Sequence, residues 1–265
     1  MPNLHRRRFL GHTAALGLVL GAPAWAQVKD LNDAINKAGR QRMLSQRTAK
    51  AYLALALQTQ TGQAEKILTQ SMALFDRQLV ELKAFSPSPA IRDTYVQLEG
   101  AWSRYKEQLV GKVPTLGGAR EVIAQSETVL ALAHQGTDRL EQASGKPVGH
   151  LVNVAGRQRM LSQRLAKYCY ASAAKINPEA ALTEIDKARS EFLAGMKTLG
   201  DAPQATARIK DELRLGQDQW VFFDSVIEST KKGGASPEGL SHLMTSSENL
   251  LTVMNEVTGL YAALA

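Results

Sequence analysis

The stretch AGRQRMLSQR, residues 38–47, returns unchanged as residues 155–164. Over the wider window 35–50 against 152–167, 13 of 16 positions are identical at an offset of 117 residues. A long internal identity at a fixed offset is typical of a duplicated structural unit. The chain is therefore expected to contain two copies of one module.

The rest of the sequence predicts helices. Apolar residues recur at spacings of three and four almost throughout, and strand-like alternation is confined to a few residues. Ser88, Asn177 and Ser236 each precede a proline, as a capping side chain does before the first residue of a helix. Together with the remaining breaks, this pattern predicts eight helices, over residues 28–60, 63–86, 89–111, 118–145, 148–176, 178–200, 203–231 and 237–264.

Grouped by the repeat, these helices form two sets of four. Three further matches support the grouping: Phe75 with Phe192, Trp102 with Trp220, and Ser126-Glu127 with Ser247-Glu248. Short connections between long amphipathic helices favour up-and-down bundles. The predicted fold is all-α, with two tandem four-helix up-and-down bundles packed as a pseudo-two-fold pair. At the junction, residues 145–147, the fourth helix is expected to run nearly straight into the fifth through a proline kink.

The N-terminus has the composition of an export signal. Arg6, Arg7 and Arg8 precede a weakly apolar run over residues 11–21, and Ala24-Trp25-Ala26 has the form of a cleavage site. The arginine cluster resembles a twin-arginine signal, and the general secretory route is the alternative. We expect residues 1–26 to be removed after Ala26, leaving modules at 27–146 and 147–265 in the periplasm.

Composition excludes several classes of function. Without residues 1–26 the chain carries 29 basic and 25 acidic residues, a modest excess that argues against a nucleic-acid partner. The motifs of di-iron bundles, haem attachment sites, phosphate loops and hydrolase elbows are lacking, so neither an enzyme nor a cofactor is expected. The single Cys169 is expected to pack as a small apolar residue, with a reactive thiol as the less favoured alternative.

The repeated helix has a cationic side. A helical wheel places seven residues of its first copy on one face: Asn36, Gly39, Arg40, Met43, Arg47, Lys50 and Ala54. The glycine costs about 1 kcal/mol relative to alanine inside a helix, so its recurrence indicates the close approach of another helix or of a ligand.

Two copies of one cationic face can meet around a pseudo-two-fold axis. This arrangement would bring Arg47 near Arg164, and Lys50 near Lys167. Two guanidinium groups repel each other unless an anion lies between them, and their planar shape suits a flat oxyanion. The sequence therefore predicts a site for a small anion.

Structural roles are the alternative for several of these residues. Arg42 and Arg159 lie toward the apolar side of the wheel and could be tied to carboxylates such as Glu127 and Glu248. The remaining motif side chains have simpler expected roles: Met43 and Met160 in packing, Ser45 and Ser162 in hydrogen bonds to helix backbone.

Both copies of the motif, over 35–47 and 152–164, resemble the signature helix of a bacterial sensor domain. Nitrate/nitrite sensor kinases share this domain with the N-terminal region of type IV pili methyl-accepting chemotaxis transducers. In the nitrate sensors it is a periplasmic four-helix bundle that dimerises through its first helix and binds one anion at the dimer axis, with one arginine from each subunit. The resemblance implies that this chain could build such a site alone.

The resemblance also implies the residues of the site. The ligand-binding arginine is matched to Arg47 and Arg164, the preceding motif arginine to Arg42 and Arg159, and the motif glycine to Gly39 and Gly156. The full set of expected ligand-binding residues is Arg47, Arg164, Gly39, Gly156, Asn36, Asn153, Arg42, Arg159, Met43, Met160, Lys50 and Lys167.

The leading hypothesis is a periplasmic binding or sensor protein for a small oxyanion, nitrate or nitrite first, that passes its state to a membrane-bound signalling protein. It would be a monomer with an internal pseudo-dimer, or a homodimer. The alternative is a helical interaction module without a ligand, whose repeated helix docks onto a membrane receptor or a second copy. That alternative predicts a surface-exposed motif.

Overall fold

A computed structural model describes residues 27–233 and 236–264, so the expected export signal lies outside the described residues. Within these ranges the chain forms eight helices: α1 (Leu31–Ala56), α2 (Thr61–Phe85), α3 (Pro89–Glu107), α4 (Ala119–Ser144), α5 (Pro147–Ala173), α6 (Pro178–Asp201), α7 (Ala207–Lys231) and α8 (Pro237–Ala262). The predicted all-α fold is confirmed.

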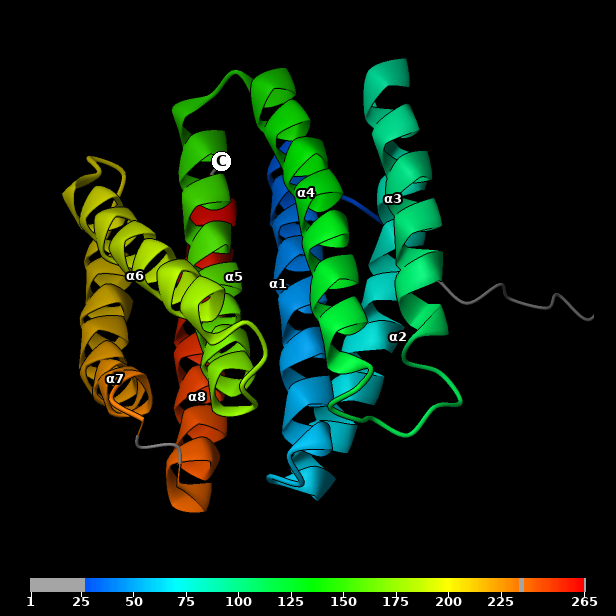
Figure 1. Ribbon diagram of the computed structural model, residues 1–265. Helices are drawn as coiled ribbons and strands as arrows, with labels where there is room; N and C mark the ends of the chain where they lie inside the picture. The colour runs from blue at the N-terminus through cyan, green and yellow to red at the C-terminus, as the bar shows by residue number, and fades with distance from the viewer. Residues whose placement is uncertain (1–26, 234–235, 265) are drawn as a thin grey trace, which may run out of the picture.

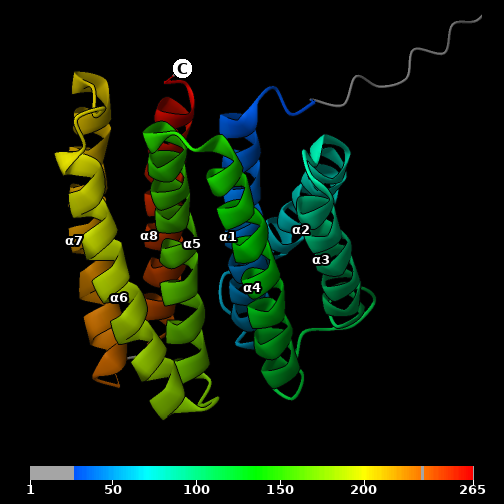
Figure 2. The ribbon, with the colours of Figure 1, turned by 90° about the horizontal axis from the view of Figure 1, so that it is seen from above.

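The two copies of the repeated helix, α1 and α5, pack against each other along the middle of the molecule (Figures 1 and 2). Around α1 lie α2 and α4, and around α5 lie α6 and α8, while α3 covers α4 and α7 covers α8. Two smaller contacts cross between the halves, α4 with α5 and α8 with α1. Two four-helix bundles, here called the first module (α1–α4) and the second module (α5–α8), are thus paired within one chain.

Capping side chains mark the starts of four of the eight described helices, α1, α3, α7 and α8. Ser88 and Ser236 accept hydrogen bonds from the backbone of Ile91 and Gly239, as the sequence predicted. Asn177 does not cap α6 in this way, because its backbone is left-handed (φ 45°) and its side chain makes no capping bond. The seventh helix begins at 207 and not 203, since Thr206 supplies its cap.

The third helix also ends earlier than predicted, at 107 in place of 111. Gly111 has a left-handed backbone (φ 70°), a conformation that interrupts a helix, and Pro114 follows it in the loop. Residues 108–118 therefore connect α3 to α4 outside either helix.

The junction between the modules is a reversal. Gly145 adopts a left-handed conformation (φ 60°) after α4, which is the usual way to end a helix and redirect the chain. The side chains of His150 and Asn153 then reach back to Glu141 on α4. The expectation that α4 runs nearly straight into α5 is wrong, because α5 folds back alongside α4 (Figure 1).

The two modules share their core arrangement. Phe75 stacks on Trp102 with ring centroids 4.0 Å apart. Phe192 stacks on Trp220 with centroids 4.4 Å apart. Each pair joins the second and third helices of its module, so the matches found in the sequence are structural equivalents. Cys169 is buried in α5 and unpaired among the described residues, in keeping with its expected packing role.

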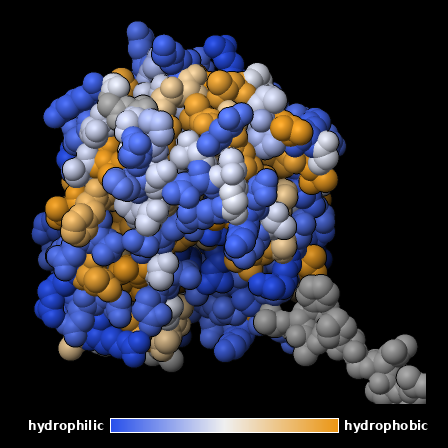
Figure 3. Space-filling model, turned by 90° about the horizontal axis from the view of Figure 1, so that it is seen from below, coloured by the Kyte–Doolittle hydropathy of each residue, from blue (hydrophilic) through white to orange (hydrophobic). Residues whose placement is uncertain are grey.

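Polar and charged side chains cover much of the surface, with apolar patches between them, as the face in Figure 3 shows. None of the helices in the described ranges combines the length and apolar character needed to cross a membrane.

Candidate functional site

The two central helices cross where their glycines meet. A Cβ added at Gly39 would lie 3.6 Å from the Cα of Gly156, and one added at Gly156 would lie 3.7 Å from the Cα of Gly39. The recurring glycine is therefore explained by the approach of another helix, one of the two reasons expected for it. This crossing marks the pseudo-two-fold axis between the modules.

Two guanidinium groups lie at the crossing, and they belong to Arg42 and Arg159. A Cβ added at Gly39 would lie within 3.4 Å of the Nη2 atoms of both arginines, and so would one added at Gly156. Arg42 Nη2 donates to the carbonyl oxygen of Asn153 at 3.1 Å, and Arg159 Nη2 donates to that of Asn36 at 3.0 Å. Each arginine thus binds the backbone of the opposite module.

The Nη1 atoms of these arginines meet neutral groups. Arg42 Nη1 donates to Nδ1 of His134 at 3.3 Å. Arg159 Nη1 donates to Oδ1 of Asn255 at 2.9 Å. Both Nε atoms are buried and have no partner among the described residues. The alternative that Arg42 and Arg159 are tied to carboxylates such as Glu127 and Glu248 is therefore wrong, since those glutamates pair with other residues.

Burial makes these charges costly. Both side chains are fully buried, and a buried charge without a counter-ion is strongly unfavourable. Burial and the charge of Arg157 lower the pKa of Arg42, against the opposing effect of Asp138 and Glu141, to about 10. Burial also lowers the pKa of Arg159 well below its ordinary value, with Arg40 and Arg42 adding to the effect. Among the described residues, the two charged neighbours that shift the pKa of Arg159 are thus both cations.

Arg47 is neutralised by a carboxylate of the second module. It binds Glu248 on α8, with Nη2 2.5 Å from Oε2, and it donates to Ser71 Oγ on α2 at 3.1 Å. Glu248 also accepts from Lys50 Nζ at 2.7 Å.

Arg164 has the equivalent arrangement on the other side of the axis. It binds Glu127 on α4 at 2.6 Å and Glu184 on α6 at 2.7 Å, and Lys167 also donates to Glu127. The expected meeting of Arg47 with Arg164 is therefore not found, because each extends to a different outer helix and meets glutamate there.

These cross-module ion pairs are partly or fully shielded from water. Lys50 and Lys167 are fully buried, and burial lowers the pKa of each to about 8 in spite of the adjacent glutamate. Burial alone would raise the pKa of Glu248, but Lys50 and Arg47 together lower it to about 2. Glu127 is shifted in the same direction by Lys167 and Arg164, which lower its pKa.

Ser126 and Ser247, which precede the two glutamates, hydrogen-bond to both modules. Ser126 Oγ accepts from Lys167 of the other module, while its carbonyl oxygen accepts from Gln46 of its own. Ser247 does the same with Lys50 and Gln163. Each Ser-Glu pair found in the sequence thus links one module to the other.

The other motif side chains have structural positions. Ser45 Oγ donates to the carbonyl oxygen of Arg42, and Ser162 Oγ to that of Arg159, which confirms their expected backbone bonds. Met43 and Met160 are buried in the core. The repeated motif is buried between the modules over most of its length, contrary to the exposed motif that the interaction-module alternative requires.

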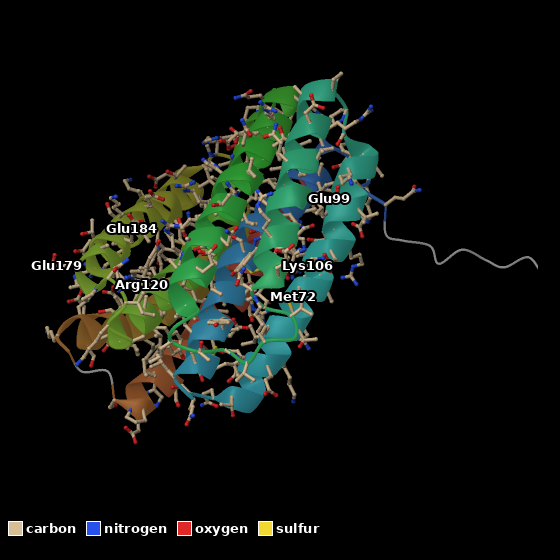
Figure 4. The ribbon with its side chains drawn as sticks, turned by 45° about the vertical axis from the view of Figure 1, so that its right-hand side comes forward. Met72, Glu99, Lys106, Arg120, Glu179 and Glu184 are labelled. Carbon is tan, nitrogen blue, oxygen red and sulfur yellow. The ribbon has the colours of Figure 1, made fainter. Side chains whose placement is uncertain are left out.

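A pocket of about 220 Å³ lies beside this arrangement, between α4, α5 and α6. Its lining includes His134, Met160 and several charged residues: Glu127, Arg157, Arg164, Glu184, Lys187 and Glu191. Figure 4 labels Glu184 on α6 and Arg120 on α4, which line a neighbouring pocket along the same edge.

The first module lacks three of the six charges of this pocket, those that α6 contributes, whereas Arg40, Arg47 and Glu248 keep the other three. At the offset of 117, Ile67 stands in place of Glu184, and Leu74 in place of Glu191. The charges that α6 contributes to the pocket are therefore a feature of one side of the axis.

Two residues of the site were missed by the sequence reasoning, His134 and Asn255. They occupy equivalent positions at the same offset of 121 as the Ser-Glu pairs, and that offset is the signal that could have found them. Each faces an axis arginine from the fourth helix of its module.

The described residues hold no cluster of side chains suited to a metal ion. What the geometry provides is a pair of buried guanidinium groups at the axis of two helical bundles, neither of which forms an ion pair with a described carboxylate. Such a combination defines an internally paired helical module.

Comparison with known families agrees with this class of protein. The family model described as "Type IV pili methyl-accepting chemotaxis transducer N-term" matches residues 24–137 and again residues 142–229. The chain belongs to this family and contains its domain twice. No curated protein and no solved structure matches the chain.

Proposed function

We propose that this chain is a periplasmic sensor module that binds one small planar oxyanion, nitrate or nitrite first, at the axis between α1 and α5. Arg42 and Arg159 are the ligand-binding arginines in this proposal. Membership of the transducer family supports a signalling role. A membrane-bound signalling protein is the proposed partner, and the proposed modules are 27–146 and 147–265.

One observation carries the proposal. Arg159 is fully buried, and all the charged neighbours that shift its pKa are cations. A single anion would compensate Arg159 and Arg42 together, because their Nη2 atoms flank the same two glycines. Guanidinium is planar and weakly hydrated, so it favours a flat oxyanion over a strongly hydrated one.

The same reasoning assigns a structural role to several residues that were first expected to bind the ligand. Arg47 and Arg164 already have carboxylate partners, so an added anion would compete with glutamate there. We assign them, with Lys50 and Lys167, to holding the two modules together. Gly39 and Gly156 make room at the axis, and the carbonyl groups of Asn36 and Asn153 orient the guanidinium groups.

The test is thermal unfolding in buffers of matched ionic strength, titrated with nitrate, nitrite, sulfate or phosphate. An anion at 100 times its Kd should stabilise the native state by about 2.7 kcal/mol. We expect a planar anion to raise Tm for the wild type and to leave the double variant Arg42→Gln/Arg159→Gln unchanged. The matched control is Arg47→Gln/Arg164→Gln, which alters the same residue type on the same helices.

The control should melt at lower temperature and still respond to the anion. If it loses the response while Arg42→Gln/Arg159→Gln keeps it, the ligand belongs to Arg47 and Arg164. If no anion shifts the wild type, the oxyanion proposal fails.

A further inference from the structure

His134 stands between the pocket and the axis. It lines the pocket formed by α4, α5 and α6, and its Nδ1 lies 3.3 Å from Nη1 of the buried Arg42. Its other nitrogen, Nε2, lies 3.3 Å from Oδ2 of Asp138, one helical turn along α4. This histidine therefore joins a solvent-facing pocket to one of the two axis arginines.

The contact with Arg42 fixes the proton of the imidazole. A guanidinium group can only donate hydrogen bonds, so Nδ1 must accept and cannot carry a proton in this arrangement. The single proton of the neutral ring then lies on Nε2, where Asp138 can accept it. With these hydrogen bonds the ring of His134 is accordingly neutral.

The charges around the ring come from four helices. They are Arg42 on α1, Asp138 on α4, Arg157 on α5 and Glu191 on α6. Burial and Arg42 lower the pKa of His134 below its ordinary value of 6.5, and Asp138 opposes them. An anion at the axis would change this balance, because it brings negative charge to the cation that most strongly disfavours the imidazolium.

We propose that His134 takes up one proton from solvent when an oxyanion binds at the axis, so that the anion binds more tightly at lower pH. This inference rests on the proposed function. As Arg42 Nη1 turns to donate to the anion, Nδ1 of His134 loses its donor and becomes free to bind a proton. The imidazolium can then donate in its turn, and its Nε2–H remains paired with Asp138.

The other side of the axis cannot take part. Asn255 occupies the equivalent position and accepts from Arg159 Nη1 at 2.9 Å, but an amide does not titrate near neutral pH. The uptake is therefore one proton per chain. The natural asparagine also shows which substitution keeps an acceptor for the arginine while removing the titration, namely His134→Asn.

The experiment is calorimetric titration of the full chain with nitrate, from neutral to mildly acidic pH, in two buffers with different ionisation enthalpies. For the wild type we expect proton uptake approaching one per nitrate. The Kd should fall by up to about tenfold for each unit by which the pH is lowered, between the pKa of His134 in the bound state and its pKa in the free protein. His134→Asn should bind nitrate with a Kd independent of pH. The control is His150→Asn, since His150 contacts Glu141 and not an axis arginine.

An NMR titration of the His134 ring gives a second readout without a variant. Its pKa should rise when nitrate is added. A wild-type Kd that is independent of pH, or a pH dependence that survives in His134→Asn, overturns the role of His134 and leaves the oxyanion site standing. Absence of nitrate binding at every pH overturns both.

Discussion

Arg42 and Arg47 lie on the same helix, five residues apart, and their environments are opposite. Arg42 is fully buried and bonded to neutral groups, whereas Arg47 is slightly exposed and paired with a carboxylate of the other module. Arg159 and Arg164 repeat the contrast on α5. The comparison teaches that an arginine in a paired helix is a candidate ligand group only where the surrounding helices supply no acid that pairs with it.

The largest expected effect comes from breaking an outer ion pair. Glu248→Gln leaves Lys50 and Arg47 shielded without a counter-charge, which should lower the free energy of unfolding by about 3–5 kcal/mol. Denaturant unfolding measures the loss. Glu256→Gln is the control on the same helix, because its exposed pair with Arg208 should contribute only about 0–1 kcal/mol. Equal effects of the two substitutions would contradict the locking role.

The next largest effect is the pH dependence of the stability that Glu248 contributes. The pKa of Glu248 is about 2 in the folded chain against 4.5 for an ordinary glutamate. Since the folded pKa is depressed, its stabilisation is complete above pH 4.5 and is lost as the pH falls toward 2, by about 3 kcal/mol in all. The stability difference between wild type and Glu248→Gln should shrink over this range. A difference that stays constant down to pH 2 would refute the assignment.

The smallest effect on stability is expected at the axis itself. In Gly39→Ala the new Cβ would lie 3.2–3.3 Å from two guanidinium nitrogens, so they must shift by a few tenths of an ångström. That crowding opposes a gain in helix propensity of about 1 kcal/mol. We expect Tm to change little and the nitrate response to weaken.

Gly156→Ala should behave in the same way as Gly39→Ala, because it meets the same two side chains. Gly259→Ala is the control, since its Cβ would meet nothing within 4 Å. It should gain helix propensity only and leave anion binding untouched. A full nitrate response in Gly39→Ala would argue against a ligand beside these glycines.

Much of the fold follows from the sequence. The repeat, the proline and glycine breaks and the matched aromatics predict eight helices in two sets and the pairing of the repeated helix with itself. The direction of the chain at Gly145 does not follow, because a glycine and a proline at a junction permit either a kink or a reversal. The side-chain contacts of His150 and Asn153 with α4 reflect the reversal, and they form only in the folded state.

The sequence predicted a pair of arginines at the axis but not which arginines they are. A helical wheel separates Arg42 from Arg47 by about 140°, yet it cannot say which direction faces the axis when the helix is buried on nearly all sides. The positions of the two glycines could have indicated the correct arginines. They mark the crossing point, and Arg42 and Arg159 lie one turn beyond them.

The hairpin at Gly145 joins the two halves of the axis covalently. In a symmetric homodimer every substitution appears on both sides of the axis, and dilution separates the subunits. Here the effective concentration of one half near the other is fixed by the short connection and does not depend on how much protein is present. One half can therefore change sequence without the other, so the two sides of the axis are free to take on different side chains, as His134 and Asn255 do.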